Sequence, residues 1–151
     1  MLITKQIEFD AGHRIPNHKS KCRNFHGHRY KVEVSLEGPI KEATGDSDDG
    51  MVLDFSDIKN VLMMQVDARF DHGFIVWEKD TEGIEALAAL GEKHKTIITT
   101  FVPTAENLAQ FIFNLLVGTY HLIYGDRLTL VKVRLFETPT CWADATSFQE
   151  L

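Results

Sequence analysis

Alternation of apolar and polar side chains predicts most of the strands in this chain. Within residues 3–13 the apolar side chains fall mainly on odd positions, and within residues 28–37 they fall on even positions. Such alternation is typical of strands that turn one face toward the core. With shorter apolar and β-branched runs included, the predicted strands are residues 3–13, 28–37, 74–77, 96–102, 128–137 and 141–148.

Apolar residues at helical spacing predict two main helices and one short helix. The first should begin with Ser56 as its N-cap and end before residues 70–73, and the second should begin after Thr104, a suitable N-cap. A short helix is expected over residues 82–90, and the polar stretch 38–50 is expected to be a loop. Because helices and strands do not alternate one for one, this order favours an α+β fold with its helices on one face of the sheet.

The composition is that of a soluble globular protein. The chain has 151 residues, enough for one domain over residues 1–151, with 44% hydrophobic and 25% charged residues. Its net charge of −6 argues against a broad nucleic-acid surface, and no apolar run approaches the ~18 residues of a membrane span. With no signal-peptide pattern at its start and only two cysteines, the chain is expected in the cytoplasm with both thiols reduced.

Three histidines continue the apolar faces of the first two strands. His13 has the parity of the apolar positions in residues 3–13, while His26 and His28 have the parity of those in residues 28–37. Side chains two apart on a strand point the same way, so the His-x-His pair aims two imidazoles at one place and His13 can supply a third. Three imidazoles with an open fourth position suit a catalytic zinc ion. The alternative is that these histidines are only hydrogen-bonded at strand ends.

Two further places carry reactive side chains beside charged neighbours. Cys22, four residues before His26, is open to three interpretations: a fourth zinc ligand, a reactive thiol or a small buried residue. Its basic neighbours are Lys19, Lys21 and Arg23. A positive setting lowers the pKa of a thiol, whereas Cys141 lacks such neighbours and is expected to be inert. Asp71 directly precedes His72, and a carboxylate beside an imidazole can tune it as an acid or base.

Glu137 lies where a buried strand face is expected to end. It has the parity of the apolar residues Val131, Val133 and Leu135. A buried carboxylate needs partners, because leaving its charge unpaired is costly or shifts its pKa. Glu137 is therefore either solvated at the strand end or set to bind a ligand with paired N–H donors, such as an amino-pyrimidinone ring.

Six short segments occur in an order that is typical of one known enzyme family. They are residues 9–13 (FDAGH), 22–28 (CRNFHGH), 50–55 (GMVLDF), 71–72 (DH), 103–109 (PTAENLA) and 137–138 (ET). In these segments the chain resembles the 6-pyruvoyltetrahydropterin synthase superfamily over nearly its whole length. Each segment is weak alone, but six in order are highly specific.

The resemblance implies a fold, an assembly and a set of site residues. The fold is the tunnelling fold, an antiparallel four-stranded sheet with two helices on one face. In that family, subunits join their sheets into a barrel, two rings commonly stack into a hexamer, and active sites form between subunits. The implied residues are the zinc ligands His13, His26 and His28, a catalytic Cys22, a proton relay from Asp71 and His72, and a pterin-anchoring Glu137.

The spacing of the cysteine refines this resemblance. The Cys-x-x-x-His-Gly-His arrangement at residues 22–28 resembles the bacterial 6-carboxytetrahydropterin synthases of the queuosine pathway. Such enzymes convert 7,8-dihydroneopterin triphosphate to 6-carboxytetrahydropterin with release of acetaldehyde and triphosphate. The alternatives are the pyruvoyl-forming reaction on the same fold and a zinc module without catalysis, closed by Cys22. The chain departs from the family pattern at Ile75-Val76 and in an extra segment, residues 78–95.

Overall fold

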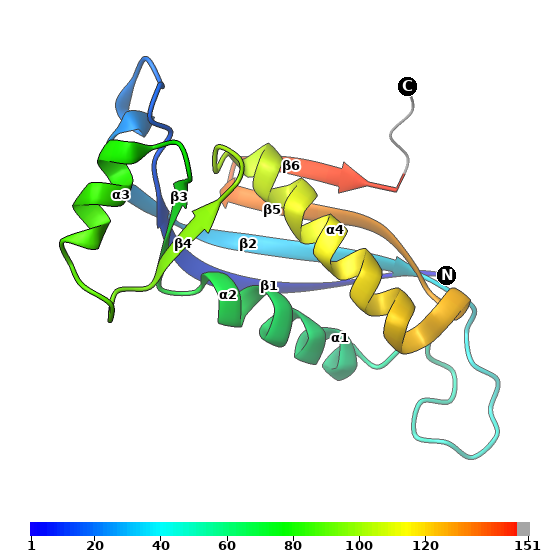
Figure 1. Ribbon diagram of the computed structural model, residues 1–151. Helices are drawn as coiled ribbons and strands as arrows, with labels where there is room; N and C mark the ends of the chain where they lie inside the picture. The colour runs from blue at the N-terminus through cyan, green and yellow to red at the C-terminus, as the bar shows by residue number, and fades with distance from the viewer. Residues whose placement is uncertain (148–151) are drawn as a thin grey trace.

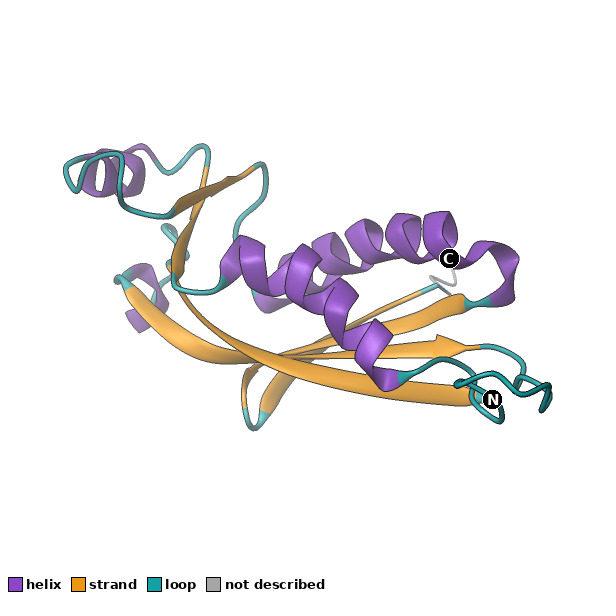
Figure 2. Ribbon diagram, turned by 90° about the horizontal axis from the view of Figure 1, so that it is seen from below, coloured by secondary structure: helices purple, strands orange, loops and turns teal. Residues whose placement is uncertain are grey.

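A computed structural model, which describes residues 1–147, shows a curled sheet with helices packed on one face (Figures 1 and 2). The longest strands, β1 (Leu2–His13) and β2 (His26–Glu37), pair antiparallel over their whole length. The remaining strands are β3 (Gly73–Trp77), β4 (Thr96–Thr99), β5 (Thr129–Thr138) and β6 (Cys141–Thr146). Phe148, the predicted end of the last strand, lies outside the described residues. The strand order across the sheet is β4-β3-β1-β2-β5-β6.

This sheet has six strands of mixed direction, so the expectation of a four-stranded antiparallel sheet is wrong. β1, β2, β5 and β6 are antiparallel neighbours, but β3 lies parallel to the end of β1, and β4 lies parallel to β3. The added strands are the short apolar run predicted at residues 74–77 and the β-branched run predicted at residues 96–102, although the second strand ends at Thr99. Helix α3 (Thr81–Ala88) joins them, because parallel neighbours need a crossover connection.

Two helical segments cover one face of the sheet (Figure 2). One is α1 (Phe55–Leu62), which continues through a π-helical turn, Met63–Asp67, into α2 (Ala68–Phe70). The other is α4 (Ala105–Tyr124). Short 3-10 turns occur at Lys21–Arg23 and Gly125–Arg127. In the described part of the chain, no helix has the length and apolar character needed to cross a membrane.

The N-caps of the two main helices test the sequence prediction directly. The predicted N-cap of α1, Ser56, is wrong, because Asp54 takes that role and accepts a hydrogen bond from the Ser56 N–H at 2.7 Å. Thr104 caps α4 as predicted, and its hydroxyl accepts from the Asn107 N–H at 3.3 Å. Both caps satisfy an N–H group that has no partner within the helix.

The hydrophobic core lies between the sheet and these two helical segments. In β1 and β2 the buried positions alternate with more exposed ones, as the sequence pattern predicted. Fully buried core residues include Val32, Val34 and Leu36 of β2, Ile58 and Leu62 of α1, and Ile112 and Leu116 of α4. Burial of one such aliphatic side chain stabilises the fold by about 1.5–3 kcal/mol. The strands that carry the histidines are therefore held firmly against the helices.

A β-bulge in β5 changes one detail of the predicted pattern. The register pairs with β2 are Lys132 with Ser35 and Leu130 with Leu36, so Val131 is left without a partner in the register. One extra residue shifts the parity of a strand. Grouping Val131 with the buried Val133 and Leu135 is therefore wrong, since Val131 is only half-buried. The relation of Glu137 to Val133 and Leu135 is unaffected.

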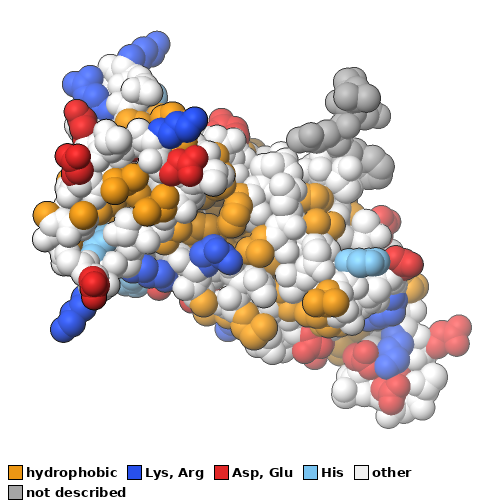
Figure 3. Space-filling model, in the orientation of Figure 1, with side chains coloured by type: hydrophobic (Ala, Val, Ile, Leu, Met, Phe, Trp, Pro, Cys, Tyr) orange, Lys and Arg blue, Asp and Glu red, His pale blue; other side chains and the backbone are white. Residues whose placement is uncertain are grey.

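Residues 38–50 form the predicted loop, where acidic and basic side chains lie close together (Figure 3). Lys41 Nζ donates to Asp46 Oδ2 at 2.9 Å and to Asp48 Oδ1 at 2.6 Å. Asp49 accepts from three backbone N–H groups at 2.7 to 3.1 Å. These internal partners account for the clustering of the three carboxylates.

Candidate metal centre and substrate pocket

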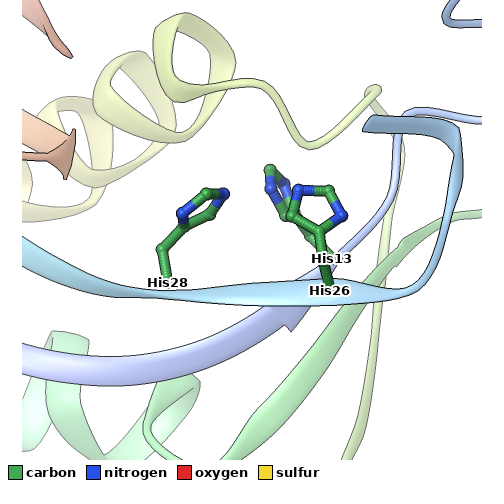
Figure 4. A group of neighbouring side chains, drawn as sticks. All are labelled: His13, His26 and His28. Atoms are coloured by element: carbon green, nitrogen blue, oxygen red, sulfur yellow. The ribbon is translucent and has the colours of Figure 1, made fainter. Parts of the chain in front are cut away.

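The three predicted histidines converge above the joined ends of β1 and β2 (Figure 4). His13 and His26 are register partners, and His28 follows two residues later on the same face. Their ring centres lie 4.6 to 5.1 Å apart, and their ligand atoms all lie within 4.8 Å of one another. This cluster can hold a metal ion.

Backbone carbonyls fix two of the three rings. His13 Nδ1 lies 2.7 Å from the Pro103 carbonyl oxygen, and His26 Nδ1 lies 2.8 Å from that of Asn24. A carbonyl oxygen only accepts, so each Nδ1 carries the proton and each Nε2 keeps a free lone pair. Carbonyl partners of this kind orient metal-binding histidines and settle their tautomer. His13 Nε2 and His28 Nε2 are buried without a hydrogen-bond partner in the described residues, as expected of atoms that bind a metal ion.

Burial favours the neutral form of His13 and His28. Burial lowers the pKa of His13 to about 4, although the Pro103 carbonyl opposes this shift. Burial likewise lowers the pKa of His28, against the opposing charge of Glu137. A neutral imidazole is the form that binds a metal ion. The donor set, three nitrogen atoms with free lone pairs, therefore fits an ion that prefers nitrogen ligands.

Two glycines allow the strands to approach closely beside the histidines. Gly12 and Gly27 are register partners in β1 and β2. A Cβ atom on Gly12 would lie 2.4 Å from Phe74 Cδ2, and one on Gly27 would lie 2.9 Å from the Ala11 carbonyl oxygen. A side chain on Gly27 would press on the backbone of β1, whereas one on Gly12 would press on the Phe74 ring of β3. Gly27 therefore allows the close approach of β1 and β2 beside the histidines.

Glu137 lies on the face that its parity predicts and points toward the cluster. Its Oε1 lies 3.7 Å from His28 Nε2, and its Oε2 lies 3.9 Å from His13 Nε2. Glu137 is skipped in the register of β5 with β6, which shifts between Phe136 and Thr138. Such irregularities often direct a side chain into a site. Glu137 also lines a pocket of about 510 Å³, which makes it available to a ligand.

The sequence analysis missed Tyr30 as part of the site. This residue is fully buried, and its ring centre lies 5.9 Å from that of His13 and 5.6 Å from that of His28. Its hydroxyl has no hydrogen-bond partner within residues 1–147. The signal was present, because Tyr30 has the parity of His26 and His28, but the pattern identified it only as core.

Cys22 lies in the turn Lys21–Arg23, on the connection between His13 and His26. Its thiol is free and half-buried. The cluster of ligand atoms found within the described residues contains no sulfur atom. The interpretation of Cys22 as a fourth ligand is therefore not supported by the described cluster, and its role as a reactive thiol stays a prediction.

Asp71 and His72 form a linked pair at the end of α2. Asp71 Oδ2 lies 2.6 Å from His72 Nδ1, and Asp71 Oδ1 accepts from the Asp10 N–H at 2.9 Å. The Asp10 N–H, followed by the His72 side chain, holds the pKa of Asp71 below its usual range. His72 has a φ of 56°, which is uncommon for a residue with a side chain. Asp71 is thus a carboxylate that orients the neighbouring imidazole.

Within the described residues, the ligand-atom cluster of the three histidines does not include His72. His72 is 80% exposed and lines a second pocket, of about 420 Å³, together with Asp10, Arg29 and His28. Asp10 and Arg29 are register partners, and their parity directs them to the face of the sheet opposite His13.

Comparison with known proteins agrees with this architecture. The sequence profile named 6-pyruvoyl tetrahydropterin synthase matches residues 2–147. The chain belongs to this family. The resemblance inferred from the sequence is thus confirmed.

Curated relatives of this family share more than a third of their residues with the chain. A protein from Haemophilus influenzae is 35% identical over 144 residues, and one from Rickettsia bellii is 37% identical over 143 residues. Both are named 6-carboxy-5,6,7,8-tetrahydropterin synthase. The matches cover 94% and 93% of this chain and 96% of each relative.

Solved structures share the fold. An uncharacterized protein from Wolinella succinogenes superposes with a TM-score of 0.79 at 22% identity, covering 98% of both chains. The 6-pyruvoyl tetrahydropterin synthase from Caenorhabditis elegans superposes with a TM-score of 0.64 at 26% identity, covering 98% of this chain and 96% of that one.

Proposed function

We propose that this protein is a zinc-dependent 6-carboxy-5,6,7,8-tetrahydropterin synthase that acts on 7,8-dihydroneopterin triphosphate in queuosine biosynthesis. The observation that carries the proposal is the cluster of His13, His26 and His28 in a chain whose relatives bear that name over almost their full length. Both thiols are free, as a reducing compartment requires, and a cytoplasmic location is part of the proposal.

The reaction divides among several side chains. His13, His26 and His28 would hold the zinc ion, which would supply a Lewis acid for the hydroxyl groups of the substrate side chain. Cys22, as thiolate, removes a proton from that side chain, and the elimination releases triphosphate. Glu137 holds the pterin ring through its paired N–H groups, so the reacting carbon stays beside the histidines. Hydrolytic cleavage of a C–C bond, in which one water molecule supplies the additional oxygen and two hydrogens, then releases acetaldehyde and leaves the 6-carboxy product.

We propose that the Asp71–His72 pair of one subunit acts in the pocket of a neighbouring subunit. Within residues 1–147, β1 pairs with β3 only through Ala11–His13, so the edge from Leu2 to Asp10 has no strand on that side. Unpaired edges favour pairing with another chain. A homo-oligomer, hexameric by resemblance, would join sheets at such edges into a barrel and bring His72 of one subunit to the pocket of the next. There His72, oriented by Asp71, exchanges protons with the substrate.

The direct test is product analysis. Purified protein incubated with 7,8-dihydroneopterin triphosphate should yield 6-carboxytetrahydropterin, acetaldehyde and triphosphate by mass spectrometry. Formation of 6-pyruvoyltetrahydropterin instead would assign the pyruvoyl-forming reaction. A zinc-loaded protein with no turnover and a sulfur ligand on the metal would support the non-catalytic module.

The proposed role of Glu137 as the pterin anchor can be tested separately. Replacing Glu137 by Gln keeps the shape but turns an amide donor toward the N–H donors of the ring. Loss of one charged partner in a buried contact costs roughly 1.5–3 kcal/mol, so pterin affinity should fall by at least about tenfold. Fluorescence titration of the zinc-loaded variant measures this change.

Glu8→Gln is the matched control for Glu137→Gln, because Glu8 lines the same pocket but is half exposed and pairs with Arg29. It should bind pterin like the parent protein. Parent-like affinity in Glu137→Gln would place the pterin anchor elsewhere, and loss of zinc in that variant would make Glu137 a ligand.

We also expect the protein to assemble into a homo-oligomer. The protein should behave in light scattering as a homo-oligomer at micromolar concentration, because a free edge along most of β1 remains exposed in a single chain. Mixing a Cys22→Ala subunit with a His72→Ala subunit should restore part of the activity, since each pocket draws on two chains. A fully active monomer would exclude both the assembly and the shared pocket.

A further inference from the structure

The extra segment, residues 78–95, contacts two loops that carry proposed catalytic residues. Near its start Asp80 binds Arg14, which directly follows the last residue of β1. At its end Lys95 binds the backbone at Asp71. This one segment therefore contacts both loops.

The Asp80–Arg14 contact is rigid and mostly buried. Arg14 donates from Nε to Asp80 Oδ2 at 2.6 Å and from Nη2 to Asp80 Oδ1 at 2.5 Å. Asp80 is only 3% exposed, and it also caps α3 by accepting from the Gly83 N–H at 3.0 Å. Arg14 holds the pKa of Asp80 below its usual range. A two-bond contact with a buried, capped carboxylate fixes the guanidinium far better than a surface ion pair does.

Arg14 in turn holds the loop that contains Cys22. It is the first residue of the connection between β1 and β2, and the next residue, Ile15, donates its N–H to the Cys22 carbonyl oxygen at 2.9 Å. The Arg14 guanidinium also lies 5.6 Å from the ring centre of Phe25, at the other end of the connection. Fixing Arg14 against Asp80 thus limits the movement of the loop and of its thiol.

Lys95 acts on the second loop. Its Nζ donates to the carbonyl oxygens of Ala68 at 3.0 Å and Asp71 at 2.8 Å. Carbonyl groups at a helix end have no partner within the helix, and a lysine there stabilises that end. The next residue, His72, has a φ of 56°, which surrounding contacts must maintain. Lys95 supplies one of those contacts.

We propose that residues 78–95 position the catalytic loops, with Asp80 fixing the loop of Cys22 and Lys95 fixing the turn at residues 71–72. Both are positioning residues, because they act through other side chains and backbone groups. This inference rests on the proposed function, which assigns those loops their catalytic roles.

Hydrogen–deuterium exchange read by mass spectrometry tests the proposal without relying on turnover. Asp80→Asn keeps the shape but removes the charge, so exchange in residues 14–25 should rise about tenfold. Lys95→Met keeps the chain length but removes the donor, so exchange in residues 68–74 should rise about two- to fivefold. Each variant should leave the other segment as in the parent.

Asp144→Asn is the matched control, because Asp144 accepts two hydrogen bonds from Arg134, both at 2.7 Å, within the β5–β6 hairpin. It should alter neither segment. If Asp80→Asn does not fold, Arg14→Lys keeps the charge but loses the two-bond geometry, and exchange in residues 14–25 should again rise.

Activity completes the test. In Asp80→Asn and Lys95→Met, kcat should fall while KM and metal content stay close to the parent values. Parent-like exchange in both segments would overturn the inference, and so would raised exchange with unchanged kcat. Failure of the parent protein to turn over 7,8-dihydroneopterin triphosphate would defeat the proposed function, while the exchange pattern would still decide whether the segment holds the two loops.

Discussion

Replacing His26 and His28 together by alanine should leave the purified protein without its metal ion and without turnover. The parent should hold about one zinc per chain on three nitrogen ligands. The double variant keeps only His13, whose single imidazole cannot hold the ion. Elemental analysis after dialysis gives the metal content, and X-ray absorption of the parent gives the ligand atoms.

His121→Ala is the control for this pair. His121 is 70% exposed, lies outside the histidine cluster and pairs with Asp126 at 3.6 Å, so its loss should leave metal content and activity unchanged. Full zinc retention in the His26→Ala/His28→Ala protein would defeat the assignment of the metal centre. Zinc loss in both proteins would point to unfolding, which circular dichroism would reveal.

The second large effect is expected at Cys22. Cys22→Ala should fold and bind zinc like the parent but lose about 10²–10⁴-fold in turnover, which is the typical contribution of a general base. The expectation rests on the absence of sulfur from the histidine cluster of the described chain and on the position of the thiol in the loop between His13 and His26. Steady-state kinetics and metal analysis on the same preparation distinguish a general base, whose loss lowers turnover, from a zinc ligand, whose loss lowers metal content.

Cys141→Ala provides the comparison, because Cys141 is exposed at the start of β6 and its sulfur lies 3.8 Å from the Thr140 hydroxyl oxygen. Its turnover and zinc content should stay close to those of the parent protein. Zinc loss in Cys22→Ala would make the thiol a ligand and favour a closed, non-catalytic centre. Parent-like turnover in Cys22→Ala would remove the thiol from the mechanism.

Local periodicity predicted much of the site because the site is built on strands. The parity of His13, His26 and His28 depends only on the backbone alternation of β1 and β2, which the folded chain keeps without interruption. Glu137 was placed correctly relative to Val133 and Leu135 for the same reason. The prediction failed at Val131, where the bulge adds a residue that alternation cannot reveal.

Contacts between distant parts of the chain could not be read from the sequence. The Pro103 carbonyl that fixes His13 comes from a segment 90 residues away, and the Arg14–Asp80 contact joins residues 66 positions apart. Neither leaves a periodic signal. The strand order is likewise a property of packing, so the runs at residues 74–77 and 96–102 were recognised as strands without showing that they extend the sheet.

The pairing of β1 with β2 also bears on how the protein matures in the cell. The metal ligands stand on two strands joined over their full length and packed on a hydrophobic core, so the cost of bringing the imidazoles together is met by folding itself. A zinc finger, by contrast, gains its structure only with the metal. Folding alone should therefore bring the three histidines together, and a protein stripped of metal should stay folded and regain an ion when the metal is returned.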